Sequence, residues 1–348
     1  MLPDLIATLR AAPSIWHKQD IQTAAIALGQ YVPDAAGNPI RLGDDCAAIP
    51  DGDGYLLLAA EGIWPQLVTQ DPWFAGWCAV MVNLSDIAAM GGRAIAIVDA
   101  LWSQSTEASQ PLLKGMQDAA NAYGIPIVGG HTNTHSPYDG LAVAIMGRSQ
   151  HLITSFEAQP GDSLMVAINL EGTYYGDYSF WNAATTADPA QLKKQLALLP
   201  KLAESGLCSA GKDISMGGLA GTLLMLCEAS GCGALLDLER IPKPANTDWH
   251  KWLTSFPSFG FLLSVPPANA QQVTNLFSLQ GITCQTVGEI IANPQVSIQH
   301  FGESALFWEG KSPLTGFGNA RAATQKATQK ATQKATQKAA AESDKNVS

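Results

Sequence analysis

The chain has 348 residues, of which 47% are hydrophobic and 14% are charged, a composition typical of a globular protein with two domains. The formal net charge is −10, and an acidic chain of this kind argues against nucleic acid as a partner. Apolar runs end within about ten residues, short of the roughly 20 that a membrane span needs, and the first residues lack a secretion signal, so we expect a cytoplasmic protein without membrane contact.

The first half of the sequence predicts alternating helices and strands. Residues 1–30 indicate one or two short helices, followed by a loop rich in turn formers. Hydrophobic periodicity predicts strands at 55–62, 94–101, 125–130 and 141–147, and helices at 71–90 and 109–122. We expect these elements to form an α/β or α+β domain over residues 1–150.

The second half has a similar element content over residues 151–310. The sequence predicts strands at 163–170, 260–265 and 286–290, helices at 189–205 and 269–280, and a Gly-rich turn into a helix at DISMGGLAG. Residues 323–338 differ in kind, because they repeat ATQK four times and offer no apolar face. We therefore expect a second domain at 151–310 and a disordered tail at 311–348.

The helix expected at 71–90 carries polar groups where a purely structural helix would not. Large apolar residues recur at three- and four-residue steps from Phe74 to Ala88. Asn83 and Asp86 break this run, and their i, i+3 spacing lets both side chains point at the same object. Gly91 and Gly92 supply a helix stop. A ligand is the favoured explanation, and a solvated polar stripe is the alternative.

Four other segments hold candidate site residues, and each is ambiguous alone. Asp44 and Asp45 follow a glycine, a pattern that forms turns more often than metal sites. Glu61 ends an apolar strand, where a carboxylate is costly unless it is exposed or paired. In GKDISMGGLAG, Lys212 and Asp213 precede a helix N-terminus, which favours phosphate, although the pattern is neither a Walker nor a dinucleotide motif.

The fourth segment is GGHT, which follows a strand of the buried type. Gly129 and Gly130 would let a ligand approach the backbone closely, and a tight turn explains them equally well. A lone histidine such as His131 is more often a structural residue than a functional one. Aromatic residues that could line a substrate pocket predict a core more readily; they are Trp73, Trp77, Trp102, Tyr174, Tyr175 and Trp181, followed by Asn182.

Taken in order, these motifs are more specific than any one of them. GDD, the acid at Glu61, NLSDIAAMGG, GGHT, PGD, DISMGGLAG and a closing GF…V…GEI strand pair resemble the aminoimidazole ribonucleotide synthetase-related (PurM-like) ATP-binding superfamily over residues 40–292. GDDCAAIP and NLSDIAAMGG are most similar to thiamine-monophosphate kinase, and GGHT is similar to selenophosphate synthetase. The whole resembles an uncharacterised subgroup of the superfamily.

This resemblance implies a two-domain α+β fold whose N-terminal strands join those of a partner subunit in a barrel across a homodimer, with ATP and Mg²⁺ beside the interface. By position, it implies Mg²⁺ ligands at Asp44, Asp45, Glu61, Asp86 and Asp213. The candidate nucleotide-binding residues are Asn83, Gly129, Gly130, Thr132 and Lys212. Carboxylate oxygens suit this chemistry, because metals and positioning supply most of the catalysis in phosphoryl transfer.

Some residues depart from the superfamily pattern. Met216 stands where many relatives have a second aspartate, His131 replaces an acidic residue of thiamine-monophosphate kinase, and no cysteine precedes Cys46 to act as the selenophosphate synthetase nucleophile. Lys18 and His131 are the candidate catalytic residues. One hypothesis is that Lys18 touches the γ-phosphate and His17 assists, although a surface lysine on an ordinary helix is the favoured interpretation.

The favoured function is ATP- and Mg²⁺-dependent phosphoryl transfer to, or phosphate activation of, a small-molecule acceptor. The alternative is a catalytically eroded nucleotide-binding regulatory or scaffold subunit, with Met216 as the eroded position. A structural dimer without nucleotide would require the carboxylate segments to coincide by chance.

Overall fold

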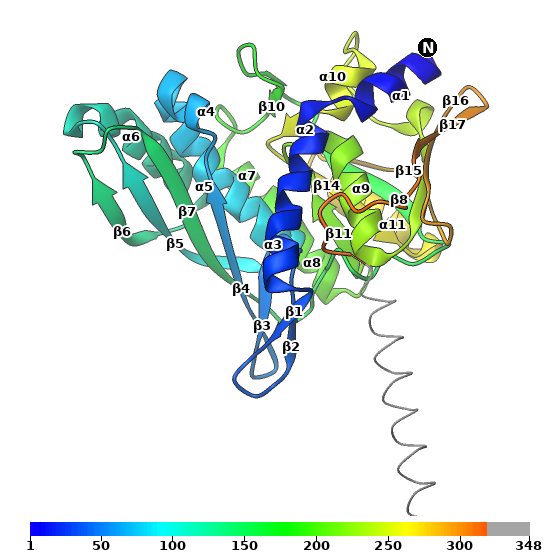
Figure 1. Cartoon of the computed structure of the whole chain (residues 1–348), viewed down its shortest axis with the longest axis horizontal. Helices are drawn as coiled ribbons and strands as arrows, with labels where there is room; N and C mark the ends of the chain where they lie inside the picture. Colours follow the sequence, from blue (N-terminus) through cyan, green and yellow to red (C-terminus); the bar gives the residue numbers. More distant parts are fainter. Residues whose placement is uncertain (319–348) are drawn as a thin grey trace, which may run out of the picture.

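The computed structural model describes residues 1–318, which form two α+β domains side by side (Figure 1). Strands and helices of the first domain lie to the left in Figure 1, and those of the second lie to the right, with the N-terminal arm in front of the second domain. The two-domain α+β prediction is confirmed. The ATQK repeat lies outside the described residues.

The first domain is built on a five-stranded sheet in the order β3-β4-β7-β5-β6. All neighbours are antiparallel except β5 and β6, which are parallel. The strands are β3 (Ala47–Asp51), β4 (Gly54–Gly62), β5 (Arg93–Trp102), β6 (Ile127–Asn133) and β7 (Gly140–Ser149). The helices are α4 (Pro65–Gln70), α5 (Pro72–Ala89) and α6 (Thr106–Tyr123), and a hairpin, β1 (Tyr31–Pro33) and β2 (Pro39–Arg41), precedes the sheet.

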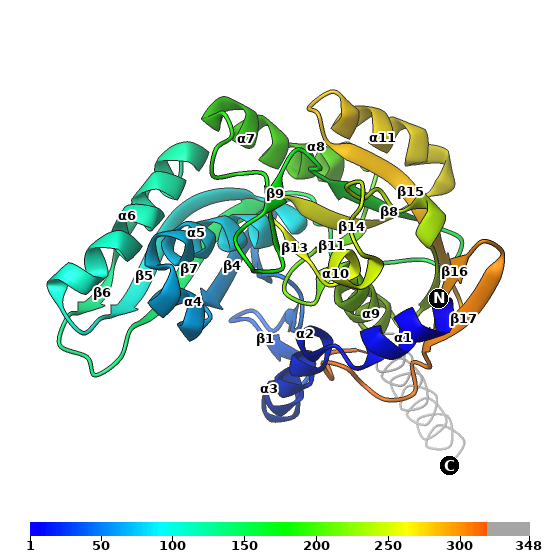
Figure 2. The ribbon, with the colours of Figure 1, turned by 90° about the horizontal axis from the view of Figure 1, so that it is seen from above.

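Helix α5 is the central helix of this domain and forms as predicted. The Asp71 side chain caps its start by accepting from the Phe74 N–H at 3.2 Å, and Gly91, with φ of 71°, ends it. Gly76 lets α5 approach α6 closely, because a Cβ there would lie 2.1 Å from the Leu112 carbonyl oxygen. Figure 2 shows α5 and α6 together on one face of the sheet.

The second domain is built on a seven-stranded sheet in the order β11-β14-β8-β15-β12-β16-β17. Its strands are β8 (Ser163–Ile168), β11 (Ala210–Asp213), β12 (Gly233–Asp237), β14 (Gly260–Val265), β15 (Thr283–Ile291), β16 (Val296–His300) and β17 (Glu303–Trp308). A small separate sheet has the order β13-β10-β9, with β9 (Thr173–Tyr174), β10 (Phe180–Asn182) and β13 (Phe256–Pro257).

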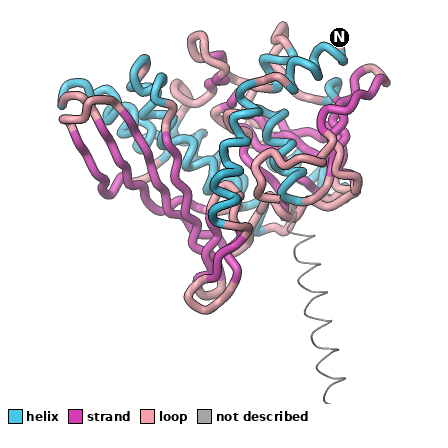
Figure 3. Tube along the Cα trace, in the orientation of Figure 1, coloured by secondary structure: helices cyan, strands magenta, loops and turns pink. Residues whose placement is uncertain are grey.

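The helices of the second domain divide its core into two layers. They are α7 (Pro189–Leu196), α8 (Leu198–Glu204), α9 (Gly218–Ser230), η2 (Leu238–Arg240), α10 (Trp249–Leu253), η3 (Pro267–Asn269) and α11 (Ala270–Ser278). Figure 2 shows α8 and α11 on one side of the large sheet and α9 on the other, and Figure 3 colours the same chain by helix and strand. In β8, Leu164 and Val166 face the core under α9, whereas Met165 faces the core under α8 and α11. The single helix predicted at 189–205 is thus two helices, α7 and α8.

The N-terminal arm packs on the second domain. It consists of α1 (Leu2–Arg10), α2 (Pro13–Trp16), η1 (His17–Asp20) and α3 (Ile21–Leu28). Leu5, Leu9 and Ile15 are buried in the same core as β8 and α9. The assignment of the whole segment 1–150 to the first domain is therefore wrong for this arm, because its apolar side chains complete the core of the second domain.

The first residues of the expected tail are folded. Leu314 and Phe317 are buried, and the Glu228 carboxylate accepts from the backbone N–H groups of Leu314 and Thr315 at 2.8 Å each. Phe317 lies against Gly43, where any Cβ would fall 2.2 Å from the Phe317 Cβ. Residues 311–318 thus belong to the second domain and support the loop that carries the GDD motif.

One face of the first sheet carries exposed apolar side chains. Leu58 of β4, Val98 of β5 and Met146 of β7 are each more than 40% exposed, and Val128 of β6 is 64% exposed. The opposite face is covered by α5 and α6. Within residues 1–318, no helix is both long enough and apolar enough to cross a membrane. A cytoplasmic location stays a prediction.

Candidate metal and nucleotide site

Three carboxylates from distant parts of the sequence meet where the two domains join. Asp45 lies in the loop before β3, Asp86 on the last turns of α5, and Asp213 at the end of β11. One oxygen from each lies within 4.8 Å of the other two. Asp86 and Asp213 are 7% and 4% exposed. The end of α5 brings them together, because Ala88 and Ala89 pack into the core of the second domain.

The chemistry of this cluster fits a hard cation. The Oδ2 atom of Asp86 and the Oδ1 atom of Asn83 are buried and have no hydrogen-bond partner among residues 1–318. Asn83 donates its Nδ2 to the Ala79 carbonyl oxygen at 2.8 Å, so its oxygen is the free end of the side chain. Buried oxygens without donors are costly, and a Mg²⁺ ion ligated by carboxylates would satisfy them.

The raised pKa values of the clustered carboxyl groups also favour a bound cation. Burial, followed by repulsion from Asp213 and Asp45, raises the pKa of Asp86 well above its ordinary value. Burial, followed by repulsion from Asp45, likewise raises the pKa of Asp213. Like charges this close disfavour ionisation of both groups unless a cation balances them.

Lys212 supplies part of the balancing charge. Its Nζ donates to Asp45 Oδ1, and the side chain is 9% exposed. Burial lowers the pKa of Lys212, but the carboxylates of Asp45, Asp44 and Asp213 outweigh it and hold the pKa above its ordinary value. The ammonium is therefore committed to Asp45, and the nucleotide contact expected of Lys212 stays a prediction.

Asp44 is not a member of the carboxylate cluster, in contrast to its predicted role as a metal ligand. Its oxygens accept from the Ser155 N–H at 3.0 and 3.2 Å and from the Ser155 hydroxyl at 2.5 Å. Burial, followed by repulsion from Asp45, raises the pKa of Asp44 to about 6. Asp44 thus ties the GDD loop to the start of the second domain and positions Asp45, whose oxygens accept from Lys212 Nζ and from the Asp213 N–H.

Glu61 and Lys18 lie at the open side of the cluster. Glu61 is exposed near the end of β4, and Lys18 is half-buried in η1. Partial burial raises the pKa of Glu61, and the nearby charge of Lys18 opposes this effect. The charge of Lys18 also opposes the rise in the pKa of Asp213. Lys18 lies close to the start of α9, since a Cβ on Gly217 would come 3.7 Å from the Lys18 Cε.

The N-terminus of α9 faces the same region. Gly217 is its N-cap, and Gly218 has φ of 63° in a space where a Cβ would lie 2.4 Å from the Leu253 carbonyl oxygen. Only glycine fits there. The amide groups of this 13-residue helix and the Lys18 ammonium form a positive region beside the carboxylates, the arrangement that binds a phosphate together with its metal.

The GGHT segment lies on β6, away from the carboxylate cluster of the same chain. Glu61 pairs with Val143, Val143 with Asp99, and Asp99 with Gly130, so three strand spacings, roughly 14 Å, separate Glu61 from β6. Gly129, Gly130, His131 and Thr132 are exposed on this edge strand, which runs on to Asn133 instead of ending at Gly130. Within one chain, these four residues do not join the cluster.

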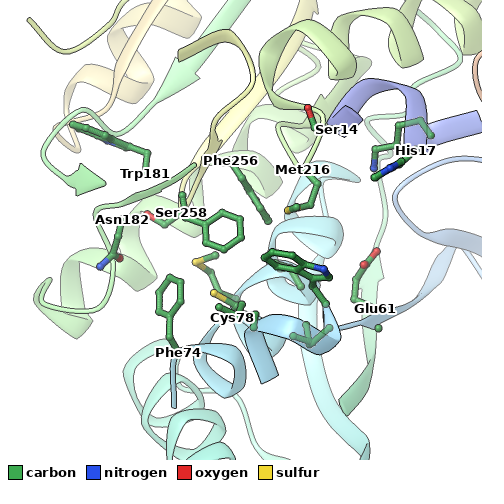
Figure 4. Close-up of a pocket in the computed structure, with 18 of the residues that line it drawn as sticks. Ser14, His17, Glu61, Phe74, Cys78, Trp181, Asn182, Met216, Phe256 and Ser258 are labelled. Atoms are coloured by element: carbon green, nitrogen blue, oxygen red, sulfur yellow. The ribbon is translucent and has the colours of Figure 1, made fainter. Parts of the chain in front are cut away.

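A cavity of about 560 Å³ opens beside Glu61 and Lys18. Figure 4 shows Glu61 and His17 at one end, Trp181 and Asn182 at the other, and Phe74, Cys78, Phe256 and Met216 between them. Trp181 and Asn182 thus line a pocket, whereas Trp77 is buried in the core under the first sheet. Met216 is 42% exposed and faces the cavity without offering a metal ligand.

Comparison with known proteins identifies the family. Residues 43–149 match the model of the AIR synthase related protein N-terminal domain, and residues 159–301 match that of the C-terminal domain. The chain belongs to the AIR synthase related protein family. The recognition made from the motifs is confirmed, and the cluster draws Asp45 and Asp86 from the first family domain and Asp213 from the second.

Individual relatives match between about three quarters and nine tenths of this chain. The chain is 54% identical over 319 residues to an uncharacterized protein of Synechocystis sp., covering 91% of this chain and 99% of the relative. It is 30% identical over 287 residues to thiamine-monophosphate kinase of Synechococcus elongatus, covering 74% and 86%. The structure of T. maritima PurL complexed with AMPPCP has a TM-score of 0.68 at 18% identity, covering 86% of this chain and 50% of PurL.

Proposed function

We propose that this AIR synthase related protein binds ATP with Mg²⁺ and transfers a phosphoryl group to, or activates through phosphate, a small metabolite. The observation that supports this most strongly is the group formed by Asp45, Asp86 and Asp213, within 4.8 Å of one another and with an orphaned oxygen on Asp86. Relatives named as kinases and a structural neighbour that binds AMPPCP support the nucleotide.

Different residues of the site would bind the metal and the phosphate groups. Asp45, Asp86 and Asp213 would hold Mg²⁺. Glu61 is close enough for its charge to act on Asp86 and Asp213, and Asn83 lies one turn before Asp86 on α5. When bound, Mg²⁺ neutralises phosphate charge and orients the transferred group. The start of α9 and the Lys18 ammonium would bind phosphate oxygens. Lys212 pairs with Asp45 and lowers the negative charge that the nucleotide meets.

The proposed transfer follows a simple balance. The bond between the γ-phosphorus and the bridging oxygen breaks, and the phosphorus forms a bond to an oxygen or nitrogen of the acceptor. ADP leaves with the electron pair of the broken bond. The acceptor loses one proton, which Glu61 at the mouth of the cavity or a water molecule takes up.

We propose further that the protein is a homodimer formed through the exposed face of the first sheet. The apolar side chains of Leu58, Val98 and Met146 on this face support that arrangement. In a barrel shared by two copies, the β6 segment with Gly129, Gly130, His131 and Thr132 would contribute to the partner's nucleotide site. This would explain its separation from the carboxylates of its own chain.

The second candidate function is a nucleotide-binding regulatory or scaffold subunit. It is favoured by one observation, which is that Met216, at a position where the superfamily pattern has aspartate, lines the cavity with a thioether that is no ligand for Mg²⁺. Such a subunit would bind ATP with Mg²⁺ but would form no ADP with any acceptor.

Calorimetric titration of ATP with and without Mg²⁺ tests the proposal. We expect Mg²⁺-dependent binding to the wild-type protein and its loss in Asp86→Asn, because the amide removes a charged ligand. Asp53→Asn, the same change on an exposed turn between β3 and β4, is the matched control and should bind normally. Absence of binding in the wild type, or equal binding in Asp86→Asn, would overturn the site. ADP formation during acceptor screening separates the enzyme from the regulatory subunit.

A further inference from the structure

The side chains that line the cavity beside the cluster indicate which kind of acceptor it can bind. We propose that it binds a small molecule with a flat, uncharged and largely apolar body, whose one reactive polar group lies at the Glu61 end. This inference rests on the proposed function, because it places the acceptor next to the metal and phosphate site. It adds the chemical class of that acceptor.

The middle of the cavity is lined by rings and sulfur atoms. Phe180 lies with its ring centroid 6.1 Å from that of Phe74 and 6.1 Å from that of Phe256, in a tilted and an edge contact respectively. Met81 and Cys78 of α5 complete this wall. Aromatic walls of this kind favour a flat body that offers ring faces or edges to them.

Most of the hydrogen-bonding capacity of the polar residues away from the Glu61 end is already used within the protein. Asn182 Oδ1 accepts from the N–H groups of Ala184 and Thr185 at 3.1 and 3.2 Å, and its Nδ2 donates to the Thr185 hydroxyl at 2.6 Å. Ser258 Oγ accepts from the Ala183 N–H at 2.9 Å. These groups hold the loop after β10 in place and offer little to a ligand.

Charged groups are confined to one end of the cavity. Glu61 and His17 lie together there (Figure 4), Lys18 also lines the cavity, and no arginine among residues 1–318 does so. A phosphate or carboxylate on the body of the ligand would be desolvated among phenyl rings without a partner, which is costly. The volume of about 560 Å³ suits a small molecule of this class.

A matched pair of dyes tests this inference. N-phenyl-1-naphthylamine is flat and uncharged, and 8-anilino-1-naphthalenesulfonate is the same body with a sulfonate. Fluorescence titration of the full chain should give the uncharged dye a Kd at least about tenfold lower. Met216→Trp, which fills the cavity from its exposed side, should raise that Kd by about tenfold or more. Leu279→Trp, at a site 79% exposed after α11, is the matched control and should leave it unchanged.

Each outcome decides the inference. Equal or tighter binding of the sulfonate, or a Kd insensitive to Met216→Trp, would overturn it. If circular dichroism shows that Met216→Trp does not fold, Ile21→Trp fills the same cavity from α3. Competitive displacement of the uncharged dye by adenosine would also overturn it, because the cavity would then hold the nucleotide base.

The same protein samples separate this inference from the proposed function. Mg²⁺-dependent ATP binding without selective binding of the uncharged dye would leave the proposed function standing and remove the acceptor class. Selective dye binding without ATP binding would remove the proposed function but leave an apolar ligand site.

Discussion

The two sheets of this protein bury their apolar residues in different ways. In the second domain, β8 and β14 are buried on both faces, because the arm and α9 cover one side and α8 and α11 cover the other. In the first domain, β4, β5 and β7 bury alternate residues under α5 and expose the rest. One sheet completes its core within the chain, and the other presents an apolar face suited to a second copy.

The largest expected effect follows from charging the exposed face. Met146→Glu places a carboxylate at the centre of the first sheet, opposite Leu58. In a symmetric dimer, two unpaired carboxylates would be buried, at a cost of about 3 kcal/mol each, so the dimer Kd should rise by well over a hundredfold. Sedimentation velocity should show a monomer.

The control for this change is Leu279→Glu, which charges an exposed apolar residue of the second domain and should leave the dimer intact. A wild-type protein that is monomeric at micromolar concentration would contradict the dimer. So would a Met146→Glu variant that sediments like the wild type. Either result would mean that the difference between the two sheets has another cause.

The contact between the two domains should be stabilised by the Lys212–Asp45 ion pair. Lys212→Met removes the ammonium that pairs with Asp45 and leaves buried carboxylates unbalanced, so unfolding should become easier by about 3–5 kcal/mol in metal-free buffer. Saturating Mg²⁺ should narrow the gap in urea midpoint between variant and wild type. Lys114→Met, which breaks an exposed pair with Asp118, should cost less than about 1 kcal/mol. Equal effects of the two variants would remove the special role of Lys212.

Truncating one leucine in each sheet compares the two cores directly. Leu164 of β8 is fully buried, so Leu164→Ala should lower the free energy of unfolding by about 3 kcal/mol. Leu58 is 49% exposed, so Leu58→Ala should lower it by less than about 0.5 kcal/mol in a monomeric Met146→Glu background. Urea denaturation of each variant measures both values. A large cost for Leu58→Ala in the monomer would show that the exposed face contributes to the core of its own chain.

Local sequence patterns predicted much of the fold and part of the site. Helix α5 has a proline after Asp71, apolar residues at helical spacing and Gly91 at its end, so its bounds and its polar face at Asn83 and Asp86 followed from the sequence. Asp45 and Asp213 were expected as Mg²⁺ ligands from the family resemblance, a role that stays a prediction. Their meeting is a long-range contact between two domains, which periodicity cannot reveal and which the family resemblance supplied.

The errors come from contacts that no local pattern records. Asp44 and Asp45 are neighbours of one type, yet Asp45 lies with Asp86 and Asp213, whereas Asp44 contacts Ser155 across the domain boundary. The apolar face of α1 was compatible with either domain. For the residues from 311, a short segment without periodicity looked like tail, although Leu314 and Phe317 are buried.

The smallest expected effect is the pH dependence of the metal-free protein. The pKa of Asp44 is raised from 3.8 to about 6, and those of Asp86 and Asp213 are raised as well. Between about pH 4 and 6 the folded chain holds protons that the unfolded chain releases, so the contribution of these three carboxyl groups to stability falls as pH rises through this window. Mg²⁺ favours the ionised carboxylates and should raise the melting temperature more at pH 7.5 than at pH 5. Calorimetry in EDTA and in Mg²⁺ checks both trends, and Asp44→Asn, which keeps an acceptor for Ser155, should flatten the metal-free curve. A melting temperature in EDTA that increases from pH 5 to pH 7.5 would contradict the raised pKa values of these carboxyl groups.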